Sequence, residues 1–255
     1  MTLISLILTY LLGYLVGAIP FSFIIAKLKG VDLRKVGSGN IGATNVLRSC
    51  GKVAGFWAYF ADIAKGVAAP LLIDLLRRAL GPNGEESEWL KILFLFSYFT
   101  PIVGHLFPVF LGFKGGKGVA TSAGVLLYLV PVPLLATIAI FFAVFLPTRI
   151  ISISSIVAAL VFPPIVALHH VLSQKDWLWE WAAFVAPSVS AEIGVFLGIA
   201  SFLSLFIIYR HRENIRRLLR GEEHSFKKKK VAKASRKSGK KLLRKKSAKS
   251  SGKRR

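Results

Sequence analysis

Cysteine is almost absent from the chain, and regular patterns of metal ligands are missing. A single cysteine, Cys50, occurs among 255 residues, so no disulfide can form within the chain. No histidine lies near Cys50 in the sequence to stabilise a thiolate, and we interpret it as a small residue at a helix edge. The five histidines are scattered without ligand spacing, so the sequence predicts no metal site and no cofactor.

Alternation of apolar and polar residues, which is typical of membrane β-barrels, is also missing. Instead 54% of the residues are hydrophobic, and they form continuous runs that approach the ~20 residues needed to cross a bilayer. The sequence therefore predicts an all-α membrane protein and excludes a soluble domain with a large core. The first run, Leu3 to Ala26, lacks a preceding basic residue and a cleavage signature, so we expect a retained span.

Acidic residues are few, and they are absent from one end of the chain. The chain has 35 basic and 12 acidic residues, yet residues 227–255 hold 16 of the basic ones and none of the acidic ones. We therefore expect two parts: an integral-membrane domain at 1–226 and a disordered, polybasic cytoplasmic tail at 227–255. The tail should contact anionic lipid head groups, and we do not expect nucleic acid as its partner.

Seven transmembrane helices, some of them short or broken, account for the apolar runs. They are expected at about residues 3–26, 53–76, 89–111, 119–131, 132–147, 150–170 and 190–209. Pro131-Val132-Pro133 separates the fourth span from the fifth, because proline breaks a helix or forces a turn. The basic segment 27–52 should lie inside and the acidic, turn-rich segment 81–88 outside. This places the N-terminus outside, the C-terminus inside and the tryptophan-containing loop near 171–190 outside.

The same topology gathers three polar segments on the cytoplasmic face: 37–48, 113–121 and 210–223. The first matches G-x-G-x-x-G, but a dinucleotide site needs a strand and a helix of a βαβ unit, which a loop between membrane spans does not provide. Its glycines permit close backbone approach, and its hydrogen-bonding and cationic side chains suit a phosphate group. These side chains are Ser38, Asn40, Thr44, Asn45 and Arg48. An ordinary capped loop is the alternative.

The second segment, Phe113 to Thr121, places Lys114 and Lys117 among glycines. It is not a Walker A motif, because Gly118 follows Lys117 where serine or threonine is required. Two lysines that merely obey the positive-inside rule are the alternative, but that rule does not require four glycines within 112–118. We therefore predict an anion site here.

The third segment carries His211 and Asn214, which share one helix face. Such a pair can orient a hydroxyl group or stabilise an oxyanion, although a solvated helix end would look similar. Two further residues, Asp62 and Lys65, lie three apart within the second span. They are either functional or a mutual pair that anchors the helices, and His105 is equally open between a structural and a functional role.

The three segments, GSGNIGATNVLR, GHLFPVFLGFKGGKGVAT and HRENIRRLLRGEE, together resemble the bacterial acyl-phosphate-dependent glycerol-3-phosphate acyltransferases, the PlsY family. The resemblance spans about residues 1–226. It implies a seven-span enzyme of the bacterial cytoplasmic (inner) membrane whose active site faces the cytoplasm. It also implies transfer of a fatty acyl group from acyl phosphate to position 1 of glycerol 3-phosphate. The products are lysophosphatidic acid and phosphate, in the first committed step of phospholipid synthesis.

The resemblance also implies site residues. Positions matching the family's active site are Ser38, Arg48, Lys117, His211 and Asn214, and either Ser152 or Ser155 matches a further serine. Positions matching its phosphate-cradling loop are Gly37, Gly39, Asn40, Gly42, Thr44 and Asn45. We assign Arg48 and Lys117 to the phosphate of glycerol 3-phosphate and the loop to the acyl-phosphate head group. His211 and Asn214 would orient the reacting groups, with either His211 or the departing phosphate as base.

Two other functions fit the sequence less well. A transporter of phosphorylated metabolites should carry polar residues near the bilayer midplane in repeated segments, whereas these motifs gather at one face. An acyltransferase that uses thioester donors through a His-x₄-Asp pair requires aspartate five residues after a histidine. No histidine of the chain has one.

Overall fold

The computed structural model describes residues 3–80, 87–173 and 193–226, and every regular element in these ranges is helical. The all-α prediction is thus confirmed for them. The chain divides into two units, Met1–Glu223 and His224–Arg255, and the described helices all belong to the first. The predicted tail at 227–255 lies outside the described residues, as does almost all of the loop predicted near 171–190.

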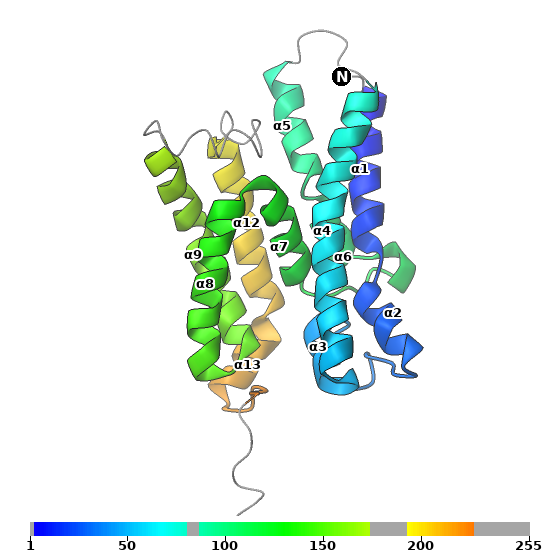
Figure 1. Ribbon diagram of the computed structural model, residues 1–255, viewed down its shortest axis with the longest axis vertical. Helices are drawn as coiled ribbons and strands as arrows, with labels where there is room; N and C mark the ends of the chain where they lie inside the picture. The colour runs from blue at the N-terminus through cyan, green and yellow to red at the C-terminus, as the bar shows by residue number, and fades with distance from the viewer. Residues whose placement is uncertain (1–2, 81–86, 174–192, 227–255) are drawn as a thin grey trace, which may run out of the picture. The chain divides into compact units, whose positions relative to one another are not determined.

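The N-terminal half contains six α-helices and one 3₁₀-helix in the described ranges (Figure 1). They are α1 (Leu3–Ala18), α2 (Phe21–Leu28), α3 (Ala43–Cys50), α4 (Lys52–Leu80), α5 (Glu88–Ser97), α6 (Thr100–Leu106) and η1 (Val109–Leu111). The first expected span, 3–26, is interrupted at Ile19-Pro20, where α1 ends and α2 begins. The third, 89–111, is interrupted at Tyr98-Phe99, before Pro101 in the first turn of α6.

The C-terminal half contains α7 (Val119–Leu129), α8 (Pro131–Thr148), α9 (Ile151–Ser173), α12 (Ile193–Arg210) and α13 (Arg212–Leu219). The division of 119–147 into two helices is confirmed, with the break at Val130. With 11 residues, α7 is about 16 Å long, which is shorter than the ~30 Å hydrocarbon core of a bilayer. The short α3 and α13 lie at the same end of the bundle in Figure 1, opposite the N-terminus.

Among the described residues, five segments are long and apolar enough to cross a membrane: 3–28, 88–111, 131–148, 151–172 and 193–210. The long helix α4 carries five charged residues between Asp62 and Arg78, and α7 is too short. The protein is an integral membrane protein with several apolar helices. The count of seven crossings and their orientation remain predictions.

Glycines permit close helix contacts beside the polar segments. A Cβ at Gly66 of α4 would lie 2.3 Å from the carbonyl oxygen of Thr121, and one at Gly124 of α7 would lie 2.1 Å from that of Ile63. A similar close approach joins α1 to α6, at Gly17 and Gly104. Small residues let membrane helices approach without a hydrophobic driving force, and here they hold α7 directly against α4.

Candidate functional site

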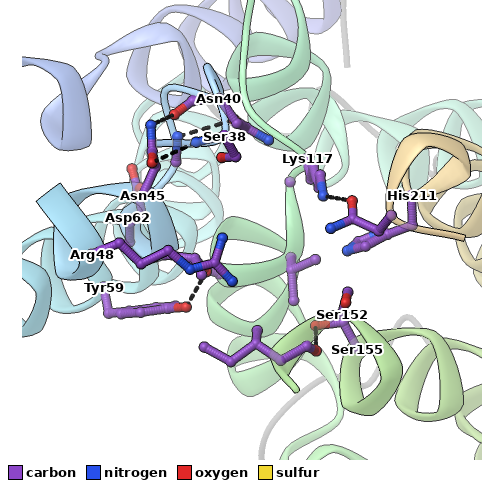
Figure 2. Close-up of a pocket in the computed structure, with 18 of the residues that line it drawn as sticks. Ser38, Asn40, Asn45, Arg48, Tyr59, Asp62, Lys117, Ser152, Ser155 and His211 are labelled. Carbon is purple, nitrogen blue, oxygen red and sulfur yellow. Dashed lines mark hydrogen bonds between the residues drawn. The ribbon is translucent and has the colours of Figure 1, made fainter. Parts of the chain in front are cut away.

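All three polar segments line one pocket of about 120 Å³ (Figure 2). Nine of the eleven predicted site residues line it: Ser38, Asn40, Gly42, Thr44, Asn45, Arg48, Lys117, His211 and Asn214. Ser152 and Ser155 of α9 line it too, whereas Gly37 and Gly39 do not. The expected convergence of the segments is therefore present in the structure. It brings together residues separated by more than 170 positions of sequence.

Two helix N-termini face this pocket. Gly42, the N-cap residue of α3, and Gly118, the N-cap residue of α7, both line it together with the first residues of each helix. The first N–H groups of a helix lack partners within the helix, and the helix dipole adds partial positive charge there. The backbone therefore favours an anion in the pocket, in addition to the cationic side chains.

The side-chain amide of Asn45 holds the first loop together. Its Oδ1 accepts a hydrogen bond from the N–H of Ser38 (3.1 Å), and its Nδ2 donates to three loop carbonyl oxygens, including that of Asn40 (2.8 Å). Gly37 has a φ of 59°, and a Cβ there would lie 2.2 Å from Asn45 Oδ1. Gly37 and Asn45 thus shape the loop, and the amide of Asn45 is already engaged within it.

Arg48 and Tyr59 reach the pocket from α3 and α4 (Figure 2). The hydroxyl groups of Tyr59 and Thr44 form a hydrogen bond. Burial lowers the pKa of Arg48, an effect that the nearby Glu223 carboxylate opposes. Arginine keeps its charge under such shifts, so Arg48 presents a permanent cation with the fork geometry that suits phosphate oxygens.

Lys117 is the second cation of the pocket, and it differs from Lys114. Lys114 is exposed and does not line the pocket, whereas Lys117 does and donates a hydrogen bond to Oδ1 of Asn214. Burial lowers the pKa of Lys117 to about 8, and Glu223 partly counters this effect. A bound anion would stabilise the charged form and raise that pKa again.

His211 lies at the start of α13 and is buried. Its Nδ1 lies 2.8 Å from the carbonyl oxygen of Ile207. Because a carbonyl can only accept, Nδ1 carries the proton and Nε2 keeps the lone pair. Burial and the nearby Lys117 lower the pKa of His211 to about 4, so the ring is neutral at pH 7. A neutral ring of such low pKa is a weak base but can still orient a hydroxyl group.

Glu223 organises one wall of the pocket, although the sequence pattern indicated no role for it. Its carboxylate accepts hydrogen bonds from Ser152 Oγ (2.9 Å) and Asn214 Nδ2 (2.7 Å) and forms an ion pair with Arg217 (2.8 Å). These contacts lower the pKa of Glu223 despite its burial. One feature of the sequence could have indicated a role for it: the acidic pair Glu222-Glu223 directly follows the strongly basic segment that ends at Arg220-Gly221.

Arg210 was also missed. Its Nη2 donates to the carbonyl oxygens of Gly116 (2.7 Å) and Gly115 (3.3 Å), which ties the glycine-rich loop to the end of α12. Gly116 itself lies over a buried side chain, since a Cβ there would lie 2.2 Å from Nε2 of His105. The loop that carries Lys117 is therefore held from both sides.

Asp62 and His105, which line the pocket, form a buried polar group with Lys65. Asp62 accepts a hydrogen bond from Ser22 Oγ (2.6 Å) and lies 3.1 Å from Lys65 Nζ, which donates to the Ile19 carbonyl oxygen (2.8 Å). The ring nitrogen Nδ1 of His105 lies 3.0 Å from Thr121 Oγ1. Lys65 does not line the pocket, and its contacts satisfy a carbonyl at the break between α1 and α2. The anchoring interpretation of the Asp62–Lys65 pair therefore fits the geometry.

An apolar cavity of about 470 Å³ adjoins the polar pocket. Six residues line both: Tyr59, Val119, Ala120, Phe141, Ile151 and Ser155. The remaining lining of the cavity is mostly apolar and comes mainly from α7, α8, α9 and α12. Its volume lies within the ~300–1,000 Å³ typical of small-molecule sites. In the described ranges, no group of three or more His, Cys, Asp and Glu side chains could hold a metal ion.

Comparison with known proteins identifies close relatives. The family model described as "Glycerol-3-phosphate acyltransferase" matches residues 7–221. Curated proteins of that name from Chlorobaculum tepidum and Aquifex aeolicus are each 40% identical, over 83% and 84% of this chain and 92% and 95% of their own. The crystal structure of PlsY (YgiH) in its glycerol 3-phosphate form is 38% identical, with a TM-score of 0.65 over 87% of this chain and 96% of its own. The crystal structure of its lysophosphatidic acid form is 36% identical in sequence, with a TM-score of 0.63.

Proposed function

This chain belongs to the glycerol-3-phosphate acyltransferase family and is an acyltransferase, and we propose that acyl phosphate is its donor. It would transfer the fatty acyl group to position 1 of glycerol 3-phosphate and release lysophosphatidic acid and phosphate, the first committed step of phospholipid synthesis. The observation that carries this proposal is the direct junction of a cationic pocket with an apolar cavity. One compartment suits two phosphate groups, and the other suits an acyl chain.

Roles follow from the positions of the side chains. Arg48 and Lys117 would bind the phosphate of glycerol 3-phosphate, because both are cations that line the pocket. The loop from Gly37 to Asn45 would hold the acyl-phosphate head group through the Ser38 side chain and the N–H groups at the start of α3, because the N–H groups of Ser38, Gly39 and Gly42 are engaged within the loop. We assign Asn45 to holding that loop, since its amide is already engaged. His211 and Asn214 would orient the attacking hydroxyl group.

The chemical step needs positioning more than a strong base. The hydroxyl oxygen attacks the carbonyl carbon of acyl phosphate, and the bond from that carbon to the phosphate oxygen breaks, its electron pair staying with phosphate. The pKa of about 4 for His211 makes it a weak base, which favours phosphate as the acceptor of the hydroxyl proton. Lys117, Arg48 and the two helix N-termini would stabilise the developing charge. No covalent acyl-enzyme is required.

The proposal extends to topology and location. We propose seven crossings in the bacterial inner membrane, with the N-terminus outside and the pocket facing the cytoplasm. In support of this, helices α2, α3 and α13 lie at one end of the bundle (Figure 1), and the segments that contain them are rich in basic residues. We also propose that the membrane enzyme comprises residues 1–226 and that residues 227–255 contact anionic lipid head groups.

A donor comparison tests the proposed reaction. Purified protein is given glycerol 3-phosphate together with either palmitoyl phosphate or palmitoyl-CoA, and lysophosphatidic acid and inorganic phosphate are measured. We expect both products with palmitoyl phosphate and neither with palmitoyl-CoA. Equal or faster product formation from the thioester would refute acyl phosphate as the donor.

The pKa of Lys117 predicts a pH dependence. With a pKa of about 8 in the unliganded pocket, Lys117 loses its proton as the pH rises through 8 and no longer attracts phosphate. We therefore expect KM for glycerol 3-phosphate to rise by up to about tenfold per pH unit above pH 8, with little change between pH 7 and 8. His211, already neutral there, contributes no titration in this range.

The matched control is Lys117→Arg, because arginine stays charged throughout this range. If that variant retains activity, its KM should not rise above pH 8. A KM of the unmodified protein that stays constant to about pH 9 would contradict the assignment of Lys117 to the substrate phosphate.

A further inference from the structure

Two side chains of the buried core line the part of the apolar cavity that lies farthest from the polar pocket along α9 and α12. Phe162 of α9 and Ala200 of α12 line the cavity and also belong to the core, with exposed fractions of 5% and 2%. One helical turn further along, Val166 and Phe196 belong to the same core but do not line the cavity. On α9 and α12 the lining of the cavity therefore ends at Phe162 and Ala200, while on α8 it reaches Leu134.

The other end of the cavity is the polar pocket. Ile151 and Ser155 of α9 line both spaces, and Phe162 lies on the same helix. Phe162 follows Ile151 by eleven positions, which corresponds to a distance of roughly 16 Å at about 1.5 Å of rise per residue. An extended saturated chain advances slightly less per carbon, so this depth accommodates roughly a dozen carbons beyond the pocket. Because one helix carries both ends, the depth of the cavity is defined by the fold.

Phe162 is the bulkier of the two core side chains in this part of the cavity. Helices α9 and α12 pack against each other and lie side by side in Figure 1, so Phe162 and the small Ala200 meet the tip of any chain that fills the cavity. Beyond them on these two helices, the buried core residues Phe196 and Val166 do not line the cavity, so a longer chain that follows α9 and α12 meets the packed core.

We propose that Phe162, with Ala200 beside it, sets the maximum length of the acyl chain that this enzyme accepts. The proposal rests on the proposed function, in that the cavity must hold the acyl group of the donor. A shorter chain should give a lower kcat/KM, because it leaves part of the cavity unfilled and loses van der Waals contacts with its lining. Chains that extend past Phe162 should be disfavoured by overpacking. The unmodified enzyme should therefore show a sharp optimum in chain length.

Two substitutions should move this optimum in opposite directions. Phe162→Ala removes the aromatic ring and extends the cavity, so the optimum should shift to chains longer by about two to four carbons. Ala200→Leu places a larger side chain in this part of the cavity, so the optimum should shift to chains shorter by about two carbons. Phe162→Leu, which keeps most of the packing, should shift the optimum in the same direction as Phe162→Ala but less.

The matched control is Phe196→Ala, which removes a fully buried ring from the same core but from a position that does not line the cavity. It should lower stability without moving the chain-length optimum. A general loosening of the core would instead move the optimum in both phenylalanine variants.

The test is a competition experiment. Full-length protein in detergent receives glycerol 3-phosphate and an equimolar mixture of lauroyl, myristoyl, palmitoyl, stearoyl and arachidoyl phosphates, and mass spectrometry measures the lysophosphatidic acid species. Ratios between products do not depend on how much of a variant is folded. If Phe162→Ala yields no product, the product ratios of Phe162→Leu test the proposal. Unchanged ratios in Phe162→Leu and Ala200→Leu, or an equal shift in Phe196→Ala, would overturn the proposal. Absence of every product with the unmodified protein would instead refute the proposed reaction.

Discussion

Replacing Lys117 with alanine is expected to cause the largest loss of function of any single lysine substitution in the described helices and loops. Lys117 lines the polar pocket, and burial has already removed much of the water from its ammonium group. Truncating one partner of a desolvated charge pair costs about 2–5 kcal/mol, which corresponds to a loss of roughly 30-fold or more in kcat/KM. The loss should appear chiefly in KM for glycerol 3-phosphate, measured at saturating palmitoyl phosphate.

Lys114→Ala is the matched control, because Lys114 belongs to the same glycine-rich segment but is exposed and outside the pocket. Its substitution should change KM by less than about threefold, as expected for a solvated charge that is screened by salt. Equal effects of the two substitutions would mean that the segment acts only through its overall charge. Unchanged kinetics of Lys117→Ala would remove this residue from the binding site.

Replacing Lys65 with methionine is expected to cause the largest fall in the free energy of unfolding of any single lysine substitution in the described helices and loops. Lys65 and Asp62 are both only 2% exposed, so the substitution leaves a buried carboxylate without its ion-pair partner. It also removes the donor to the Ile19 carbonyl oxygen at the break between α1 and α2. Breaking one side of a buried pair costs about 3–5 kcal/mol. We expect a clear fall in the midpoint of thermal unfolding of the detergent-solubilised protein.

The chain supplies a matched control for this substitution. Lys91 and Glu88 also form an ion pair with a spacing of three residues, but their side chains are 45% and 69% exposed. Lys91→Met should therefore cost less than about 1 kcal/mol. Adding Asp62→Asn to Lys65→Met should recover part of the lost stability, since it removes the uncompensated charge. If Lys65→Met unfolds no earlier than Lys91→Met, the anchoring role is wrong.

Local features of the sequence were sufficient to predict much of the fold. Apolar run lengths predicted the helices, and Pro131 correctly predicted the break between α7 and α8. The break at Ile19-Pro20 was not foreseen in detail, because the apolar run continues through Pro20 and hydropathy does not register a change in helix direction. The break is tolerated because the ammonium group of Lys65, 46 residues further along the chain, donates a hydrogen bond to the carbonyl oxygen of Ile19.

Some features of the candidate site could be predicted from the sequence, whereas others became visible only in the structure. Glycine-rich phosphate loops, Arg48, Lys117 and His211 are recognisable because their chemistry depends on residue type and short spacing, and the structure brings their side chains to one pocket. Asn45 was assigned to phosphate contact, whereas its amide holds the loop, because hydrogen bonds to three backbone carbonyls have no signature in the sequence. Glu223 lacked an assigned role for a related reason: two of its partners, Ser152 and Asn214, lie on different helices.

Residue types and spacing along the chain thus predict a helical membrane protein with cationic, glycine-rich phosphate segments, since these are local properties of hydropathy, charge and backbone freedom. The acyltransferase function was indicated by the resemblance of the three motifs to a known family. The tertiary structure adds the contacts between residues that lie far apart in the sequence. It places Lys117, already chosen by the resemblance, in the pocket, turns Glu223 and Arg210 into supports of the pocket, and joins the pocket to an apolar cavity that Phe162 lines. Burial and the shape of a cavity arise from the packing of whole helices, which is why they become visible in three dimensions alone.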